Sequence, residues 1–136
     1  MKAKVGFICV HNSCRSQMAE AIAKLVASEN IEPYSGGTAI KDEINQDAVR
    51  TISELYGVDM NETQHSKLIT ELPELDIVVT MGCNVVCPFL PSKYTEDWGL
   101  EDPSGKDDKE FAKTAKSIEE KVLDLAKRIK NGQIDI

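Results

Sequence analysis

The stretch that decides the fold is residues 4–16, which read KVGFICVHNSCRS. Its first part, residues 4–10, is a short apolar run that stops abruptly at a polar segment, and this pattern is typical of a buried β-strand. From residue 16 to residue 30, apolar side chains recur at three- and four-residue spacing, which predicts a helix that covers one face of a sheet. The apolar positions are Met18, Ala21, Ile22, Leu25 and Val26, and the polar positions opposite them are Glu20, Lys24 and Glu29.

Three further strands are predicted downstream. Residues 32–38 form a weak strand that breaks at Gly36 and Gly37, residues 76–81 form a second buried strand, and residues 93–98 form a short last strand. Because helical segments separate the strands, we expect a small parallel α/β sheet that is covered on both faces.

Two more amphipathic helices are predicted. Asn45 offers an N-cap for the first, which ends at Gly57, and the second runs over residues 107–131 and is stopped by Gly132. The apolar positions are Ala48, Ile52 and Leu55 in the first helix and Phe111, Ala115, Ile118, Val122, Leu125 and Ile129 in the second.

The composition excludes several classes of protein. The 136 residues carry 16 Lys plus Arg against 23 Asp plus Glu, so the formal net charge is -7, and no basic block predicts binding to nucleic acid or to an anionic membrane. No apolar run is long enough for a signal peptide or a membrane span. We therefore expect a single cytoplasmic domain over residues 1–136, whose 4 cysteines are reduced thiols with a chemical role.

The segment between the first strand and the first helix fits the pattern C-x5-R-S, with Cys9, Arg15 and Ser16 at the fixed positions. At the carboxyl end of a parallel strand, the intervening residues let backbone N–H groups converge on a tetrahedral oxyanion in front of a helix N-terminus. Arg15 can hold two oxygens in a bidentate grip, and the same groups favour a nucleophilic thiolate on Cys9, with a hydrogen bond from Ser16. The residues expected to bind the oxyanion are Val10, His11, Asn12, Ser13, Cys14, Arg15 and Ser16.

Other conspicuous residues have simpler interpretations. Cys14 lies inside the predicted loop without an evident partner, so we assign it a packing role. His11 is expected to support the loop backbone and not to act as a ligand or a base, and His65 is expected at the surface. Trp98 is interpreted as a core residue, and the charged residues 106–110 as the solvated start of the last helix.

Five stretches carry a family resemblance: residues 9–16, 17–20, 34–37, 78–83 and 98–103. Across them the chain resembles the arsenate reductases of the thioredoxin-coupled type, which share their fold and loop with the low-molecular-weight protein tyrosine phosphatases. The resemblance implies an α/β three-layer sandwich with a small four-stranded parallel sheet of flavodoxin-like topology.

The resemblance also implies how the loop is used. Cys9 attacks arsenate to form a covalent thiol adduct, while Arg15 and the loop amides hold the oxygens. Asp102 is the general acid for the departing hydroxide, and Pro103 confines the preceding backbone to extended conformations that help to aim the carboxyl group. Phosphate and sulfate are the expected competing oxyanions, and we expect a monomer.

Two later cysteines are implied to complete the reaction. Cys83 displaces arsenite and forms a disulfide with Cys9, and Cys87 then moves the disulfide to the pair Cys83 and Cys87, where thioredoxin reduces it. Only residues 84–86 separate the two, a shorter spacing than in typical family members, so a low-molecular-weight thiol is the alternative external reductant. No bound cofactor and no metal are expected.

Two rival functions are open at this point. A low-molecular-weight tyrosine phosphatase would use Cys9, Arg15 and Asp102 alone, but Ser104 and Gly105 stand where such phosphatases typically carry aromatic residues. A thiol metal site would use all four cysteines, but neither the C-x4-C nor the C-x3-C spacing is the usual C-x2-C of zinc sites.

A last expectation concerns an ion. Some relatives hold potassium behind the loop through an Asn, a Glu, a Ser and an Asp. Asn12, Glu20 and Ser35 match the first three, and Lys67 stands at the fourth place when the chain is aligned through residues 64–66. Because an ammonium group has the same single charge and three donors, we predict that Lys67 takes the place of the ion.

Overall fold

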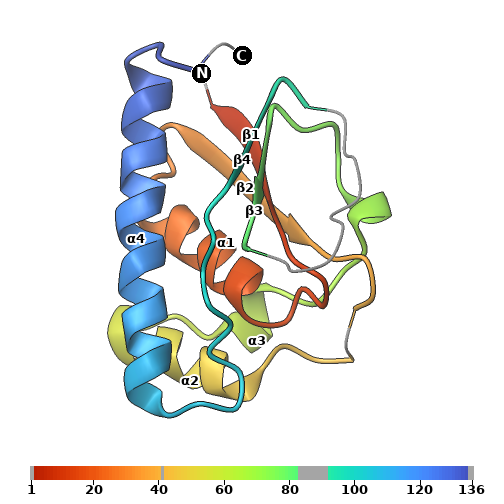
Figure 1. The fold of residues 1–136 in the computed structure, drawn as a ribbon, viewed down its shortest axis with the longest axis vertical. Helices are drawn as coiled ribbons and strands as arrows, with labels where there is room; N and C mark the ends of the chain where they lie inside the picture. Colours follow the sequence, from red (N-terminus) through yellow and green to blue (C-terminus); the bar gives the residue numbers. More distant parts are fainter. Residues whose placement is uncertain (1, 41, 83–91, 135–136) are drawn as a thin grey trace.

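The computed structural model describes residues 2–40, 42–82 and 92–134. A four-stranded sheet with the order β2-β1-β3-β4 lies at its centre (Figure 1). The strands are β1 (Ala3–Ile8), β2 (Ile31–Gly36), β3 (Ile77–Thr80) and β4 (Tyr94–Asp97). Every neighbouring pair is parallel. The predicted fold class, an α/β protein with a small four-stranded parallel sheet of flavodoxin-like topology, is therefore confirmed.

Three long helices and two short ones accompany these strands in the described part of the chain. They are α1 (Arg15–Val26), α2 (Gln46–Tyr56), α3 (Met60–Thr63), the 3-10 helix η1 (Ile69–Glu71) and α4 (Asp108–Lys130). The three predicted long helices are confirmed, although α1 ends at Val26 and not at residue 30 as predicted. The helices α3 and η1 are too short to show a periodicity. None of the described helices has both the length and the apolar composition needed to cross a membrane.

The predicted helix ends follow from capping. The Asn45 side chain accepts the backbone N–H of Asp47 at 2.9 Å, which satisfies a free donor at the start of α2. Gly57 ends the same helix with a φ of 72°, a left-handed conformation that glycine adopts without steric cost. Asp107 caps α4 by accepting the N–H of Glu110 at 3.2 Å. These caps explain why α2 begins and ends, and why α4 begins, close to the predicted residues.

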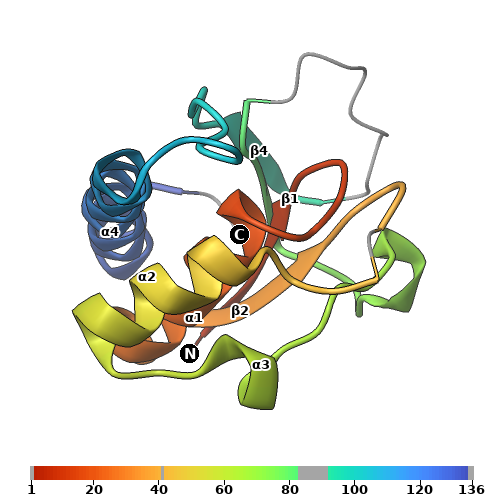
Figure 2. The same cartoon turned by 90° about the horizontal axis from the view of Figure 1, so that it is seen from below.

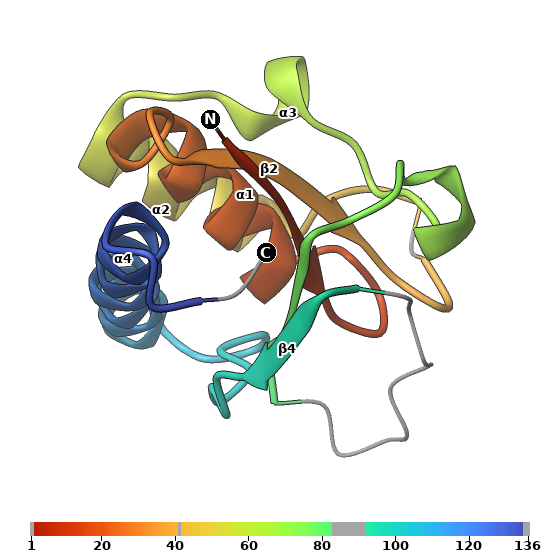
Figure 3. The ribbon, with the colours of Figure 1, turned by 90° about the horizontal axis from the view of Figure 1, so that it is seen from above.

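The sheet separates two apolar clusters of different size. Figures 2 and 3 show α1, α2 and α4 together on one side of the sheet, with the η1 segment on the other side. The helix side holds the main core, whose largest fully buried side chains include Phe7, Met18, Ile22, Ile52, Ile77, Phe111, Ile118 and Leu125. The opposite face carries a smaller cluster of Ile8, Leu75 and Val78 against Ile69 and Leu72. Both faces are covered, as predicted.

Four predictions about helix faces are wrong. Leu25, Val26 and Leu55 were expected in the core, but they are 46%, 37% and 45% exposed. All three lie in the last turn of their helices, and periodicity identifies a face without showing how far the neighbouring elements extend along it. Glu20, expected on the polar face of α1, is only 5% exposed, because its carboxylate has partners inside the protein.

The strand order determines where a site can form. The chain moves from β1 to β2 on one side and then crosses to β3 on the other side of β1, so the strand order reverses at β1. In parallel sheets of this kind, ligands bind at the carboxyl ends of the strands, at the position where the order reverses. The segment 9–14, which joins β1 to α1, lies at that position (Figure 1).

Candidate active site

The loop over residues 9–14 is held by the end of β2. The carbonyl of Val10 accepts the backbone N–H groups of Thr38 and Ala39, both at 2.9 Å, and the Cys9 N–H donates to the Gly36 carbonyl at 3.3 Å. Gly37 passes so close to the loop that a Cβ atom there would lie 2.5 Å from the Val10 oxygen. Backbone contacts of this kind depend on a residue without a side chain at position 37.

The candidate nucleophile lies at the base of this loop. Cys9 is 5% exposed, and its Sγ lies 2.9 Å from the Ser16 Oγ. The hydrogen bond predicted between these two residues is therefore present. The Ser16 oxygen also accepts a hydrogen bond from Asn12 Nδ2 at 2.9 Å. The sulfur thus has an oriented hydroxyl group beside it at the start of α1.

Asn12 gives the loop its shape. It has a φ of 49°, in the left-handed region that few residues other than glycine adopt, although Asn tolerates it better than most. Its backbone carbonyl accepts hydrogen bonds from Ser66 Oγ at 2.9 Å and from Gln17 Nε2 at 3.1 Å. Because the residue is fully buried, these contacts hold the strained backbone in place.

Arg15 connects the loop to the opposite wall of the site. Its Nη1 donates to the carbonyl oxygens of Met81 and Leu100, both at 2.7 Å. The Nε and Nη2 groups carry three further N–H donors in the same plane. These can meet two oxygens of a tetrahedral oxyanion, as predicted, while Nη1 fixes the orientation of the guanidinium group.

An open crevice of about 760 Å³ lies between the loop and this opposite wall. Its lining residues are Val10, His11, Arg15, Gly82, Asp97, Gly99, Leu100, Glu101, Asp102 and Lys106. The structure therefore brings the predicted residues Arg15 and Asp102 to one cavity. Gly82, which also lines it, directly precedes Cys83 in the sequence. The predicted residues Cys83 and Cys87 themselves lie outside the described part of the chain.

The Asp102 carboxyl is held in a turn. Its Oδ1 accepts hydrogen bonds from the Ser104 hydroxyl at 2.7 Å and from the Ser104 backbone N–H at 3.0 Å. Ser104 in turn accepts a hydrogen bond from Asn45 Nδ2 at 3.3 Å, and the Asn45 backbone N–H donates to the Ser13 carbonyl at 2.7 Å. The cap of α2 thus contacts both the loop and the turn that carries the candidate acid.

Cys14 differs from Cys9 in its surroundings. Burial raises the pKa of the Cys14 thiol to about 12, and the nearby Asp102 carboxyl adds to this rise. The thiol is therefore protonated near neutral pH and is a poor nucleophile. This environment agrees with the packing role predicted for it.

The remaining sequence interpretations have clear outcomes. His11 supports the backbone through a hydrogen bond of 2.8 Å between its Nδ1 and the Ala39 carbonyl, as predicted. His65 is exposed, as predicted. Trp98 is 7% exposed, and its ring centroid lies 5.5 Å from that of Phe7, which confirms the core assignment.

Sequence reasoning missed several residues of the site. Lys106 was interpreted as part of a solvated helix start, yet it lines the crevice and lies 3.4 Å from the Glu101 carboxylate. Its position four residues after the candidate acid was the available signal. Gln17 lies in phase with the apolar residue Ala21 of α1, so a polar group on the buried face was visible in the sequence. Gln64 carried no signal.

The residues behind the loop meet as predicted, with one difference. The Lys67 ammonium lies 3.3 Å from Glu20 Oε1, and the Ser35 hydroxyl donates to the same oxygen at 2.6 Å. Asn12 meets Lys67 through the backbone, because its Oδ1 accepts the Lys67 N–H at 2.9 Å. Replacement of a potassium ion by Lys67 stays a prediction. Within residues 2–40, 42–82 and 92–134, no three His, Cys, Asp or Glu side chains gather as a metal site.

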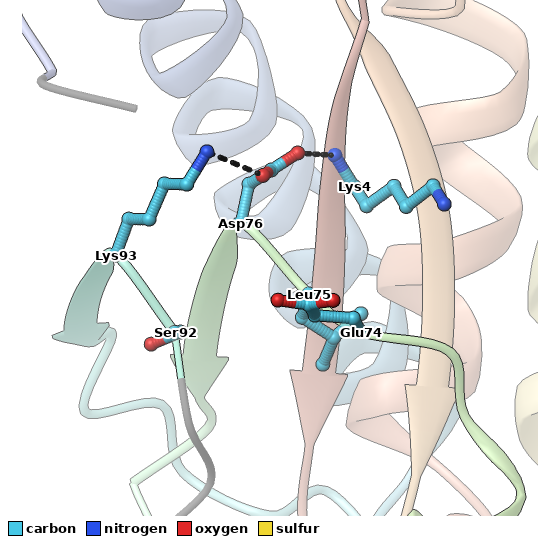
Figure 4. Close-up of a pocket in the computed structure, with 6 residues that line it drawn as sticks. All are labelled: Lys4, Glu74, Leu75, Asp76, Ser92 and Lys93. Carbon is cyan, nitrogen blue, oxygen red and sulfur yellow. Dashed lines mark hydrogen bonds and ion pairs between the residues drawn. The ribbon is translucent and has the colours of Figure 1, made fainter.

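A second pocket lies at the other end of the sheet (Figure 4). Asp76 sits between the Lys93 ammonium, at 3.5 Å, and the Lys4 backbone N–H, at 2.9 Å. The other lining residues are Glu74, Leu75 and Ser92. The described lining of this pocket contains no cysteine, and its Asp76 carboxylate already has two partners. It offers no chemistry comparable to that of the crevice.

Comparison with known proteins gives consistent matches. Residues 4–134 match the family described as low molecular weight phosphotyrosine protein phosphatase. Arsenate reductase 1 of Staphylococcus epidermidis is 38% identical over 133 residues, which cover 94% of this chain and 98% of that protein. A solved arsenate reductase in the phosphate binding state has a TM-score of 0.83 and 32% identity, covering 95% of this chain and 99% of that one. A thioredoxin-dependent arsenate reductase of Corynebacterium glutamicum has a TM-score of 0.75 and 33% identity, covering 96% of this chain and 63% of that one.

Proposed function

We propose that this chain, which belongs to the low molecular weight phosphotyrosine protein phosphatase family, is an arsenate reductase. The observation that carries the proposal is the crevice in which the loop after Cys9, the Arg15 guanidinium and the Asp102 carboxyl meet. Arsenate is a tetrahedral oxyanion, the kind of ligand that a helix N-terminus and a planar guanidinium group bind.

In the first step, the Cys9 thiolate attacks the arsenic atom. An S–As bond forms and an As–O bond breaks, and the departing hydroxide takes a proton from Asp102 and leaves as water. The Nε and Nη2 groups of Arg15, together with backbone N–H groups of residues 10–16, hold the remaining oxygens. Arsenic stays in the pentavalent state at this stage.

In the second step, the Cys83 thiolate attacks the Cys9 sulfur. An S–S bond forms, the S–As bond breaks, and its electron pair stays on arsenic, which leaves as arsenite. Arsenic gains the two electrons that the two thiols lose. The Cys87 thiolate then attacks Cys83, forms the Cys83–Cys87 disulfide and releases the Cys9 thiolate. The position of Gly82 in the crevice supports this order, because Cys83 is the next residue in the sequence.

An external reductant must then reduce the Cys83–Cys87 disulfide. We propose thioredoxin, because a structural relative is a thioredoxin-dependent arsenate reductase. A low-molecular-weight thiol is the alternative that the short spacing favours. The protein is proposed to be a monomeric single domain over residues 1–136 that works in the cytoplasm, where thiols stay reduced. It needs no bound cofactor, since the cysteines carry the electrons.

The rival function is hydrolysis of phosphotyrosine with Cys9, Arg15 and Asp102. The described lining of the crevice contains no aromatic side chain other than the His11 imidazole, and it contains Lys106 and Glu101. This polar lining offers no flat apolar slot for a tyrosine ring. It favours a small, free oxyanion as the substrate.

The proposal is tested by arsenate-dependent consumption of reducing equivalents, with thioredoxin and thioredoxin reductase or with a monothiol, beside hydrolysis of a phosphate ester. Cys9→Ser is expected to abolish both activities. Cys87→Ser is expected to release about one arsenite per enzyme with thioredoxin as the sole reductant and then to stall, because the exchange step lacks its attacking thiolate. Multiple turnovers by Cys87→Ser under these conditions would disprove the relay, and ester hydrolysis without arsenate reduction would establish the rival.

A further inference from the structure

A row of polar side chains lies buried behind the loop. Asn12, Ser16 and Gln17 are 0% exposed, and Gln64 is 7% exposed. A buried amide needs partners for both its oxygen and its NH2 group, because an unpaired polar group in the interior is costly. In the described part of the chain, every buried side-chain nitrogen and oxygen has such a partner.

Two donors at the ends of this row fix its direction. The backbone N–H of Lys67 donates to Asn12 Oδ1 at 2.9 Å, so the NH2 group of Asn12 must point the other way, to the Ser16 oxygen. The Lys24 ammonium donates to Gln64 Oε1 at 3.5 Å, so the NH2 group of Gln64 faces away from Lys24.

Gln17 joins the two ends. Its Oε1 accepts a hydrogen bond from Gln64 Nε2 at 2.6 Å, and its own Nε2 donates to Asn12 Oδ1 at 2.9 Å. The same Nε2 lies 2.9 Å from the His65 carbonyl, which can only accept. Every hydrogen bond in the row therefore points from Lys24 toward the loop.

The row ends at the nucleophile. The Ser16 hydroxyl has a single hydrogen, and its oxygen already accepts a hydrogen bond from Asn12. Once Cys9 is ionised, its sulfur can only accept, so the Ser16 hydroxyl hydrogen is then donated to it across 2.9 Å. A donated hydrogen bond stabilises a thiolate more than a thiol.

We infer that Gln17 and Gln64 are positioning residues, which keep the Ser16 hydroxyl oriented as a donor to the Cys9 thiolate. Neither glutamine touches the substrate, and Gln64 reaches the sulfur only through the other members of the row. The inference rests on the proposed role of Cys9 as the nucleophile.

The test is Gln64→Glu, which keeps the shape of the side chain but removes its donor. A glutamate carboxylate cannot donate to Gln17, and it retains the contact with Lys24, so the fold keeps its support at this end. The readout is the rate at which iodoacetamide labels Cys9, resolved from Cys14 by mass spectrometry of the digested full chain. At pH 7 the labelling rate is expected to fall about three- to tenfold. Direct loss of a hydrogen bond to a charged group would cost more, but Gln64 acts on the sulfur only through the other members of the row.

A second substitution separates positioning from general damage. In a Ser16→Ala background the row no longer reaches the sulfur, so Gln64→Glu is expected to cause no further slowing. Gln133→Glu, the same change at an exposed position, is the matched control and is expected to have no effect. Equal slowing by Gln64→Glu with and without the Ser16 hydroxyl, or unchanged labelling in the single variant, would overturn the inference. Because labelling needs no arsenate, the outcome is independent of whether the protein reduces arsenate.

Discussion

The two walls of the crevice are built in different ways. On the loop side, Asn12 and Ser16 are fully buried; Asn12 accepts the backbone N–H of Lys67 from a distant part of the chain and donates to Ser16. On the other side, Asp97 at the end of β4 and Glu101 and Asp102 in the segment after β4 are exposed. The difference indicates a division of tasks. The thiol that must be ionised lies in a rigid, buried setting, whereas the acid that exchanges a proton with water lies in an exposed turn.

The largest expected effect comes from the exposed wall. Asp102→Asn keeps the shape of the turn and removes the proton, so the maximal rate of arsenate reduction is expected to fall about 10²- to 10⁴-fold. Glu101→Gln, a neutralisation at the adjacent exposed position, serves as the control and is expected to change the rate far less. If Asp102→Asn alters only the affinity for arsenate, the residue shapes the turn and does not supply a proton.

The buried wall is tested through Gly37. Gly37→Ala places a Cβ 2.5 Å from the backbone oxygen of Val10, which cannot move without distorting the loop. We expect a loss of about 2–3 kcal/mol in the free energy of unfolding, measured by urea denaturation, because overpacking against backbone is poorly relieved. The matched change Gly6→Ala meets the far end of the flexible Leu75 side chain, so its cost is expected to be smaller. An equal loss of unfolding free energy in the two variants would show that the loop backbone shifts as easily as the Leu75 side chain.

The base of the exposed wall is held by an ion pair. Burial raises the pKa of the Glu96 carboxyl, but hydrogen bonds from Arg128, Trp98 and Tyr94 outweigh it and lower the pKa from 4.5 to about 2. Arg128 contacts both carboxylate oxygens, at 2.8 and 3.0 Å. Because the folded-state pKa is lowered, this stabilisation is present above pH 4.5 and is lost as the pH falls toward 2.

Glu96→Gln removes that contribution. We expect the variant to be about 1–2 kcal/mol less stable than the unmodified protein at pH 7, and the gap to shrink between pH 4.5 and pH 2. Thermal unfolding across this range measures it. Glu120→Gln, a change in the exposed part of α4, controls for net charge. A gap that does not depend on pH would assign the effect to packing and not to the charge of Glu96.

The smallest expected effect concerns Lys67 behind the loop. If its ammonium stands in for a potassium ion, exchanging potassium for sodium at constant ionic strength will leave the melting temperature of the unmodified protein unchanged. Lys67→Asp is then expected to create a dependence on potassium, with a rise of about 2–4 °C in potassium over sodium. A potassium-specific rise in the unmodified protein would show that the ion binds there and that the alignment through residues 64–66 is wrong.

Much of this molecule was predictable because its signals are local. The apolar run of β1 and the C-x5-R-S pattern that follows predicted the strand, the loop and the helix. The cap at Asn45 and the glycine at position 57 predicted both ends of α2. The predictions failed where the tertiary environment decides whether a side chain is buried. Leu25 and Leu55 are examples, because their exposure depends on where neighbouring elements end.

The sequence by itself determined the order of strands and helices, the place of the loop after β1, and the presence of one Cys, one Arg and one Asp suited to oxyanion chemistry. Periodicity, capping and motif spacing act over a few residues, so a chain read in order is enough to find them. Only the tertiary structure decided the partners of these groups. Gln17 and Gln64 are 47 residues apart, and the Arg15 nitrogen meets carbonyls 66 and 85 residues away. Such contacts form because buried polar groups must be paired and because the parallel sheet brings the ends of distant strands together. Neither cause can be traced in the sequence to a particular pair of residues.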